Sequence, residues 1–218
     1  MDHAASPVPH VQDTHPRPRE RAPTALCRDL AAPAPTAIAR FCARLDAAFG
    51  ALAHESAPSR HPAFARELRA ALAEAAAAPD LLTPAQRESG AAGYRRHLLA
   101  ADPAGRYAVV SLVWEPGQWS PVHGHHAWCG YAVLEGELTE IAYRWNEAAC
   151  CAIDARKHAR PTGAVSYVRA GREAIHRLGH AGAKTDAPAI SLHVYGVAGE
   201  RVATHVNDVV AVNARAHA

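Results

Sequence analysis

Two histidines one residue apart, His123 and His125, have the spacing in this sequence that most directly suggests chemistry. In a β-strand, side chains at positions i and i+2 point to the same face. Two imidazoles placed this way suit neighbouring positions on one metal ion, and Gly124 between them lets the backbone run close to its neighbours. Imidazole binds zinc, copper, iron and nickel, so the pair alone does not choose the metal. The chain has 15 histidines, and a bare pair could equally be incidental.

The residues around this pair match a longer pattern. Gly117, His123, His125 and Gly136 are in register with Gly, five residues, His-x-His, three or four residues, Glu, six residues, Gly. This pattern resembles the first signature of the cupin superfamily of small β-barrels. Where most metal-binding cupins carry a glutamate ligand, this chain has Cys129, so the two histidines need a third partner. Thiol dioxygenases of the cysteine dioxygenase family make the same replacement and bind iron through three histidines.

Two later segments supply further candidate site residues. His176 lies in the sequence Ile-His-Arg-Leu, which is similar to the setting of the family's third histidine. Ser191, His193 and Tyr195 alternate with apolar residues and would share one face of a strand. Three polar side chains facing into a small barrel would be costly without partners, which favours a wet or metal-lined pocket. This second segment resembles the family's Ser-Leu-His-Leu-Tyr, whose polar residues point into the active site.

A third match precedes the histidines. Tyr94, Arg95 and Arg96 resemble the family's Tyr-x-Arg segment, in which the arginine binds the substrate carboxylate and the tyrosine lies beside it. By alternation Arg96, and not Arg95, shares a face with Tyr94 and is expected to point inward. Arginine suits this task because its planar guanidinium can hold a carboxylate through two hydrogen bonds and stays charged. The alternative is that the two arginines are a solvated surface pair.

These motifs follow one another in the family's order over about residues 93–213. The chain is therefore identified as similar to a bacterial cysteine dioxygenase of the arginine type. The resemblance implies a site that holds Fe(II) and takes a small thiol and O₂, both of whose oxygen atoms are added to the sulfur to give a sulfinic acid. The implied metal ligands are His123, His125 and His176.

The resemblance also implies catalytic roles. Tyr195 would donate a hydrogen bond to the reacting oxygen, and Ser191 and His193 would orient Tyr195 and the ligands. In a subset of the family, a thioether bond joins a cysteine at the Cys129 position to the tyrosine at the Tyr195 position. Both partners are present here, so the same crosslink could form.

Substrate choice remains open between related thiols. Homologues that carry glutamine at the position of Arg96 are associated with 3-mercaptopropionate, so Arg96 favours cysteine. Arg96 would nevertheless serve any carboxylated thiol, including 3-mercaptopropionate or mercaptosuccinate. A cupin that binds a metal or small ligand without oxygen chemistry is a further alternative. The missing glutamate and the polar face that ends at Tyr195 argue against it.

The spacing of apolar residues predicts the elements that position these side chains. Residues 36–92 are expected to hold helices at 36–49 and 62–78 and a short third helix that begins at Thr83-Pro84. Beyond Gly93, short segments rich in β-branched and aromatic residues alternate with turn residues, which indicates antiparallel strands. A further strand is expected through His176, and a loop over residues 146–161. The other expected strands are 95–100, 107–114, 130–134, 138–145, 164–169, 189–194 and 206–212.

The predicted fold class is therefore mostly β. We expect a cupin, a small antiparallel barrel or jelly roll, with the N-terminal helices packed outside it. Residues 1–35 are rich in Pro, Ala, His and Arg without periodicity and are predicted to be a disordered tail. Residues 36–218 are predicted to form one cupin domain, with its barrel at 93–213.

Composition excludes several classes of function. A net charge of +2 gives no argument for nucleic acid or acidic lipid. The 5 cysteines are irregularly spaced and indicate neither a disulfide framework nor a Cys-x-x-Cys zinc site. The sequence shows no secretory signal and no apolar stretch that could span a bilayer. We therefore expect a cytoplasmic monomer without nucleic-acid or membrane partners, in a reducing setting that keeps iron ferrous.

Overall fold

The computed structural model describes residues 34–212, so the tail predicted for residues 1–35 falls almost wholly outside the described residues. The helices are α1 (Ala37–Ala51), the 3-10 helix η1 (Pro58–Arg60), α2 (Pro62–Ala76), and the 3-10 helices η2 (Pro84–Arg87) and η3 (Gly199–Arg201). The strands are β1 (Arg95–Ala101), β2 (Ala108–Trp114), β3 (His123–His125), β4 (Cys129–Glu135), β5 (Glu137–Asn146), β6 (Cys151–Pro161), β7 (Val165–Val168), β8 (Gly171–Gly179), β9 (Ala189–Tyr195) and β10 (Asn207–Val209).

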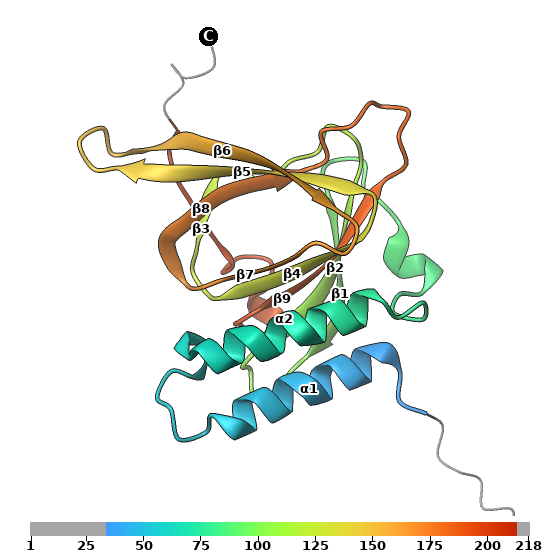
Figure 1. Ribbon diagram of the computed structural model, residues 1–218. Helices are drawn as coiled ribbons and strands as arrows, with labels where there is room; N and C mark the ends of the chain where they lie inside the picture. The colour runs from blue at the N-terminus through green and yellow to red at the C-terminus, as the bar shows by residue number, and fades with distance from the viewer. Residues whose placement is uncertain (1–33, 213–218) are drawn as a thin grey trace, which may run out of the picture. The chain divides into compact units, whose positions relative to one another are not determined.

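The strands form two five-stranded sheets whose neighbouring strands are antiparallel. The first sheet has the order β1-β2-β9-β4-β7, and the second has the order β10-β3-β8-β5-β6. Figure 1 shows the two sheets facing each other. This is the mostly β, jelly-roll arrangement of a cupin that the sequence predicts. Over residues 34–212 the two sheets are not joined into one closed barrel.

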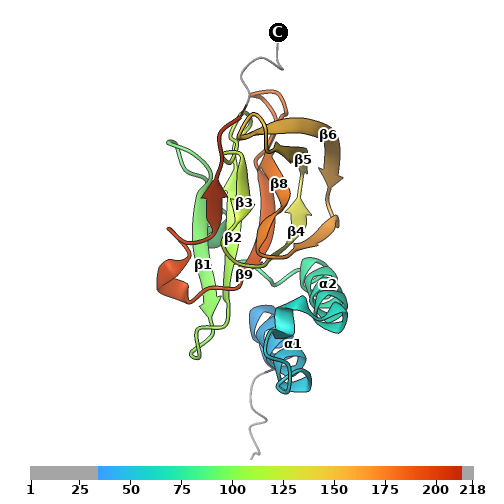
Figure 2. The same ribbon diagram turned by 90° about the vertical axis from the view of Figure 1, so that its left-hand side faces the viewer.

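The two long helices cover the outer face of the first sheet, as Figures 1 and 2 show. α1 begins after Thr36, whose side chain accepts a hydrogen bond from the Ala39 amide at 3.2 Å, so the predicted N-cap is confirmed. α2 lies close to β4 at Gly130, where an added Cβ would come within 3.0 Å of the Leu68 and Leu72 side chains. The prediction that the helices pack outside the sheets is confirmed. None of the helices within residues 34–212 is long and apolar enough to cross a membrane.

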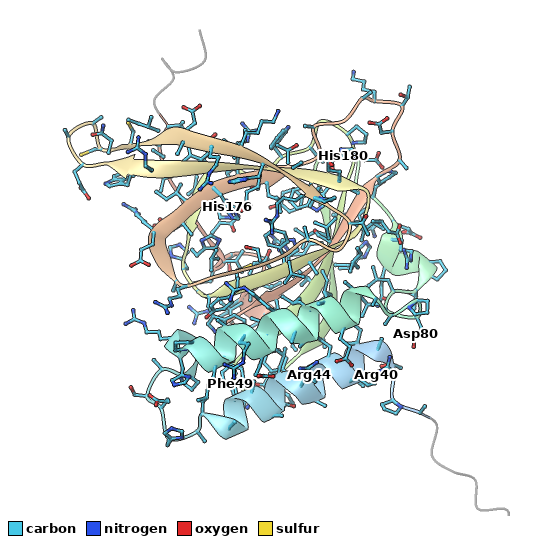
Figure 3. The ribbon with its side chains drawn as sticks, viewed as in Figure 1. Arg40, Arg44, Phe49, Asp80, His176 and His180 are labelled. Atoms are coloured by element: carbon cyan, nitrogen blue, oxygen red, sulfur yellow. The ribbon has the colours of Figure 1, made fainter. Side chains whose placement is uncertain are left out.

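Contacts between the helices combine exposed charges with buried rings. Arg44 on α1, labelled in Figure 3, places its Nη1 2.5 Å from the Glu74 carboxylate on α2. This ion pair is exposed and therefore stabilises the fold by no more than about 1 kcal/mol. Phe49 and Phe64 meet edge to face with their ring centroids 4.9 Å apart, and Phe64 is fully buried. Burial of such rings stabilises the fold more than the exposed ion pair does.

The central strands of the first sheet are buried on both faces, and the alternation of their side chains separates two environments. Every residue of β2 and β9 is buried. On β9, Leu192 and Val194 belong to the core beneath the helices. The intervening residues Ser191, His193 and Tyr195 face the space between the two sheets, as alternation predicts. One strand therefore stabilises the core with one face and carries chemistry on the other.

Three predicted elements differ from the structure. Residues 146–161, predicted to be a loop, contain β6, which pairs with β5 from Glu137↔Pro161 to Asn146↔Cys151. More than half of β6 is exposed, and its middle carries the charged residues Asp154, Arg156 and Lys157, so it lacks the apolar alternation by which a strand is recognised in sequence. The predicted third helix is the short 3-10 helix η2, where Thr83 and Gln86 form a capping box. The last predicted strand, 206–212, is reduced to β10.

Candidate metal centre

Three histidines from two adjacent strands of the second sheet form a compact cluster. His123 on β3 lies directly opposite His176 on β8, and His125 follows two residues later on the same face. Their ring centroids are 4.8–5.2 Å apart, and one ligand nitrogen from each lies within 4.8 Å of the other two. Gly124 permits the close approach, because an added Cβ would lie 3.0 Å from the Gly171 carbonyl oxygen. Figure 3 labels His176 on β8.

Burial keeps two of these imidazoles neutral. Burial, followed by the charge of His176, lowers the pKa of His123 to about 4. The same two causes, in the same order, lower the pKa of His125 to about 2. Neutral imidazole is the form that binds a metal ion, so both rings can bind one near neutral pH.

The hydrogen bonds of the three histidines show which ring nitrogens are available to bind a metal ion. The Nδ1 of His123 lies 2.8 Å from the Pro121 carbonyl oxygen and therefore donates, which leaves Nε2 as its ligand atom. The Nδ1 of His176 lies 2.6 Å from Glu140 Oε1 and donates in the same way. Among the described residues, the buried Nδ1 of His125 has no hydrogen-bond partner. Three converging imidazoles, two of them oriented by acceptors behind them, fit a transition-metal ion.

A chain of hydrogen bonds runs from Trp114 on β2 along one face of β9 to Tyr195, which lines the same cavity as the histidines. Trp114 Nε1 donates to Ser191 Oγ at 2.9 Å, Ser191 Oγ lies 2.9 Å from His193 Nε2, and His193 Nδ1 lies 3.2 Å from the Tyr195 hydroxyl. A serine hydroxyl has two acceptor lone pairs, so these contacts are compatible with either neutral tautomer of His193. In the tautomer protonated at Nδ1, Ser191 donates to Nε2, the Nδ1–H donates to Tyr195, and the Tyr195 hydroxyl proton is free to donate into the cavity. Sequence reasoning identified the other three residues but missed Trp114.

Cys129 and Tyr195 are direct partners across β4 and β9. Facing pairs of this kind place their Cβ atoms about 4.5–5.5 Å apart. Burial raises the pKa of the Cys129 thiol. Burial also raises the pKa of Tyr195 well above its ordinary value, while the nearby Arg96 opposes this. Both groups are therefore protonated near neutral pH, and Tyr195 is a hydrogen-bond donor.

Arg96 and Tyr94 line the same cavity as the histidines, so Arg96 points inward as predicted. Arg96 donates to the Val202 carbonyl oxygen at 3.3 Å and to the Tyr94 hydroxyl at 3.4 Å. Its buried Nε has no partner within residues 34–212. Arg95 instead points outward, where its Nη1 lies 3.3 Å from Glu88. The guanidinium of Arg96 is thus held by neutral groups and has capacity for a carboxylate.

The cavity is small, with a free volume of about 30 Å³. It also contains residues that sequence reasoning did not single out, including Tyr131 and Asn207. Asn207 lies on β10 directly opposite His125. No spacing pattern marks Asn207 in the sequence, because it reaches the site only through the pairing of β10 with β3. None of the described residues that line the cavity is Asp or Glu.

Glu140 on β5 is the acidic residue in contact with the ligand set, and sequence reasoning missed it. Burial raises its pKa, but the hydrogen bond from His176 and the charges of His176 and Arg160 outweigh this effect and lower the pKa below its ordinary value. The Glu140 carboxylate is therefore ionised near neutral pH. This hydrogen bond from Nδ1 orients the His176 ring on β8.

A model of a known family, described as cysteine dioxygenase type I, matches residues 89–203. This is more than half of the 218 residues. The chain belongs to the cysteine dioxygenase type I family. The matched stretch contains every predicted site residue, from Tyr94 to Tyr195, and ends before Asn207. Membership of this family and the buried histidine cluster together support a metal-binding cupin enzyme of the cysteine dioxygenase type.

Solved structures with similar folds are distant. A protein from Thermus thermophilus is 20% identical with a TM-score of 0.40, and the match covers 53% of this chain and 96% of that one. A protein with a double-stranded β-helix domain from Klebsiella pneumoniae is 15% identical with a TM-score of 0.42, and the match covers 56% and 87%. A cupin 2 domain-containing protein from Halorhodospira halophila is 18% identical with a TM-score of 0.39, and the match covers 58% and 74%.

Proposed function

We propose that this chain is a thiol dioxygenase that uses Fe(II) and O₂ to oxidise L-cysteine to cysteine sulfinic acid. The observation that carries the proposal is the composition of one small cavity. Three histidines that fit a metal ion share its walls with Arg96, which has no acidic partner among the described residues, and with the hydroxyl of Tyr195. A compact substrate with a carboxylate and a metal-binding group matches this combination.

Arg96 would bind the substrate carboxylate. Its hydrogen bonds to Val202 and Tyr94 go to neutral oxygens and are long, and its Nε has no partner in the described part of the chain. A carboxylate would give the guanidinium its counter-ion through a charge-assisted hydrogen bond. Tyr94, stacked on Trp114 with ring centroids 4.3 Å apart, fixes the side of the cavity along which the carboxylate would lie. Arg96 would thereby direct the thiol of a small substrate towards the histidines.

Tyr195 would donate a hydrogen bond at the reacting end of the substrate. Its proton is free in the His193 tautomer in which the donors run from Trp114 through Ser191 and His193 to Tyr195. Burial raises the pKa of Tyr195, so the hydroxyl stays protonated and acts as a donor. The buried walls of β2 and β9 exclude bulk water from this end of the cavity.

Fe(II) held by the three histidines would supply open positions at which a thiolate and O₂ can meet. The overall conversion is R–SH + O₂ → R–SO₂H. The sulfur supplies all four electrons that reduce O₂, and both oxygen atoms remain on it. No further reductant is needed.

A second carboxylated thiol is an alternative substrate for a specific reason. Arg96 would select for a carboxylate, but none of the described residues that line the cavity is an acid that could pair with the amine of cysteine. Thiols such as 3-mercaptopropionate and mercaptosuccinate therefore meet the same recognition group.

The test is oxygen consumption by the iron-loaded protein with cysteine, 3-mercaptopropionate, mercaptosuccinate and cysteamine. We expect the carboxylated thiols to be oxidised, with cysteine preferred. Cysteamine has the thiol and amine but no carboxylate, so it should be a poor substrate. A preference for cysteamine would contradict the role of Arg96, and no oxygen consumption with any of the four would contradict the proposed activity.

A further inference from the structure

Glu140 contacts the histidine cluster from the side of His176 that faces away from the proposed metal ion. The proposed function assigns no role to this carboxylate. Its Oε1 lies 2.6 Å from Nδ1 of His176, which is a short, charge-assisted hydrogen bond. Glu140 belongs to β5, and its backbone faces Leu178 rather than His176 in the β5–β8 pairing. His176 is two residues from Leu178, so the strand register makes Glu140 and His176 diagonal neighbours on one face of the sheet, within reach of each other's side chains.

Two other strands fix the Glu140 carboxylate. The Tyr131 hydroxyl on β4 donates to Oε2 at 3.3 Å, and Arg160 Nε on β6 lies 3.7 Å from the same oxygen. Arg160 is itself held, because it lies over the Tyr131 ring at 5.3 Å and donates to the Val165 carbonyl oxygen at 3.0 Å. Both Glu140 and Arg160 are largely shielded from solvent, with side-chain exposures of 15% and 21%.

The three histidines differ in what lies behind them. His123 has the neutral carbonyl oxygen of Pro121, and the buried Nδ1 of His125 has no partner among the described residues. Within residues 34–212, His176 is the one histidine of the three that contacts a carboxylate. Imidazole binds a metal ion as a neutral ligand, and the position at which most metal-binding cupins carry a glutamate ligand holds Cys129. The Glu140 carboxylate therefore acts on the ligand set through its hydrogen bond with His176.

We propose that Glu140 is a positioning residue that fixes the tautomer and orientation of His176 and increases its donor strength towards the metal. This inference rests on the metal site of the proposed function and adds to it an outer carboxylate, held by Tyr131 and Arg160. Carboxylates behind histidine ligands raise ligand basicity, and their loss typically weakens metal binding about 10- to 100-fold. A purely structural role for Glu140, as the partner of Arg160, is less consistent with the distances, because the 3.7 Å contact is longer than the 2.6 Å one.

The test compares metal affinity in Glu140→Gln and in the matched variant Glu137→Gln. Glu137 lies on the same strand but is exposed, and its side chain has no hydrogen bond or ion pair within residues 34–212. Metal-free protein is titrated anaerobically with Fe(II), and separately with Co(II), against a competing chelator. We expect Glu140→Gln to bind both ions at least about 10-fold more weakly than the unmutated protein, and Glu137→Gln to bind them equally well. Equal affinity of Glu140→Gln and the unmutated protein would overturn the proposal.

A second measurement needs no variant and remains decisive if Glu140→Gln fails to fold. Proton–nitrogen NMR of the zinc-loaded, unmutated protein reports which ring nitrogen of His176 carries the proton. We expect a protected, strongly downfield proton on Nδ1, as a short hydrogen bond to a carboxylate produces. A proton on Nε2, or a rapidly exchanging one on Nδ1, would refute the role of Glu140. Failure of the unmutated protein to bind any metal would instead refute the proposed function, so the two failures are distinguishable.

Discussion

Replacing Arg96 with Ala tests the substrate-recognition step of the proposed function. Arg96 is partly buried, its two recorded hydrogen-bond partners are neutral oxygens, and none of the residues lining the cavity within 34–212 is another Arg or a Lys. In the variant, a bound carboxylate would therefore lose its cation and gain no substitute. Removing one partner of such a desolvated pair costs on the order of 2–5 kcal/mol.

The lower half of that range applies here, because Arg96 is partly and not fully buried. About 2–3 kcal/mol corresponds to a KM for cysteine raised roughly 30- to 150-fold. The kcat should change less, since the hydrogen bonds of Arg96 go to Val202 and Tyr94 and not to the histidine cluster. Discrimination between cysteine and cysteamine should fall by a similar factor, because cysteamine never used the guanidinium.

The assay is steady-state oxygen consumption with both thiols, at equal iron content. Arg95→Ala is the matched control: Arg95 is adjacent and exposed, and it pairs with Glu88 outside the cavity. Its KM should stay at the unmutated value. An unchanged KM for cysteine in Arg96→Ala would show that the carboxylate is bound elsewhere and would refute the reasoning.

Three further predictions concern other parts of the site. Tyr195→Phe should lower kcat by about 10²-fold or more, as loss of a preorganised donor does, while Tyr143→Phe, a buried tyrosine in a separate cluster, should not; equal kcat values in the two variants would exclude the role of Tyr195. Metal-free protein should lose stability as pH falls from about 6.5 towards 4. Burial and the charge of His176 lower the pKa of His123 in the folded protein to about 4. As pH falls, the unfolded chain therefore binds a proton at His123 before the folded protein does. This difference is on the order of 3 kcal/mol across that window, of which about 2 kcal/mol is lost by pH 5; urea unfolding at pH 7 and pH 5 measures that part, and equal stability at the two pH values would contradict it. Cys129 and Tyr195 face each other on β4 and β9, so repeated turnover should produce a fraction of protein two hydrogen atoms lighter by intact mass; this fraction should be absent in Cys129→Ser, and its absence from the unmutated protein would exclude the crosslink.

The sequence was sufficient for those parts of the site that follow from local spacing. The i, i+2 spacing placed His123 and His125 on one face of β3, and alternation on β9 separated Ser191 and its polar neighbours from the apolar face. The choice of His176 as the third ligand came from the resemblance to the family. The structure brings it opposite His123 through the pairing of β3 with β8.

The remaining features depend on contacts between distant segments. Glu140 and His176 are 36 residues apart, and nothing in the spacing of β5 marks Glu140 as different from any other partly buried acid on a strand. β6 was predicted as a loop because its residues from Asp154 onward are mostly exposed or polar, so the strand shows no apolar alternation. The spacing of apolar residues predicts strands that bury one face. It does not predict a strand whose residues are mostly exposed.

The central claim is that this site adds both atoms of O₂ to the sulfur of a carboxylated thiol. The most direct measurement is single-turnover oxidation of cysteine by the iron-loaded protein under ¹⁸O₂, with mass spectrometry of the product. The proposed function predicts a sulfinic acid that carries two labelled oxygen atoms, and no product from His176→Ala under the same conditions. A product with one labelled atom or none, or equal product from His176→Ala, would contradict the claim.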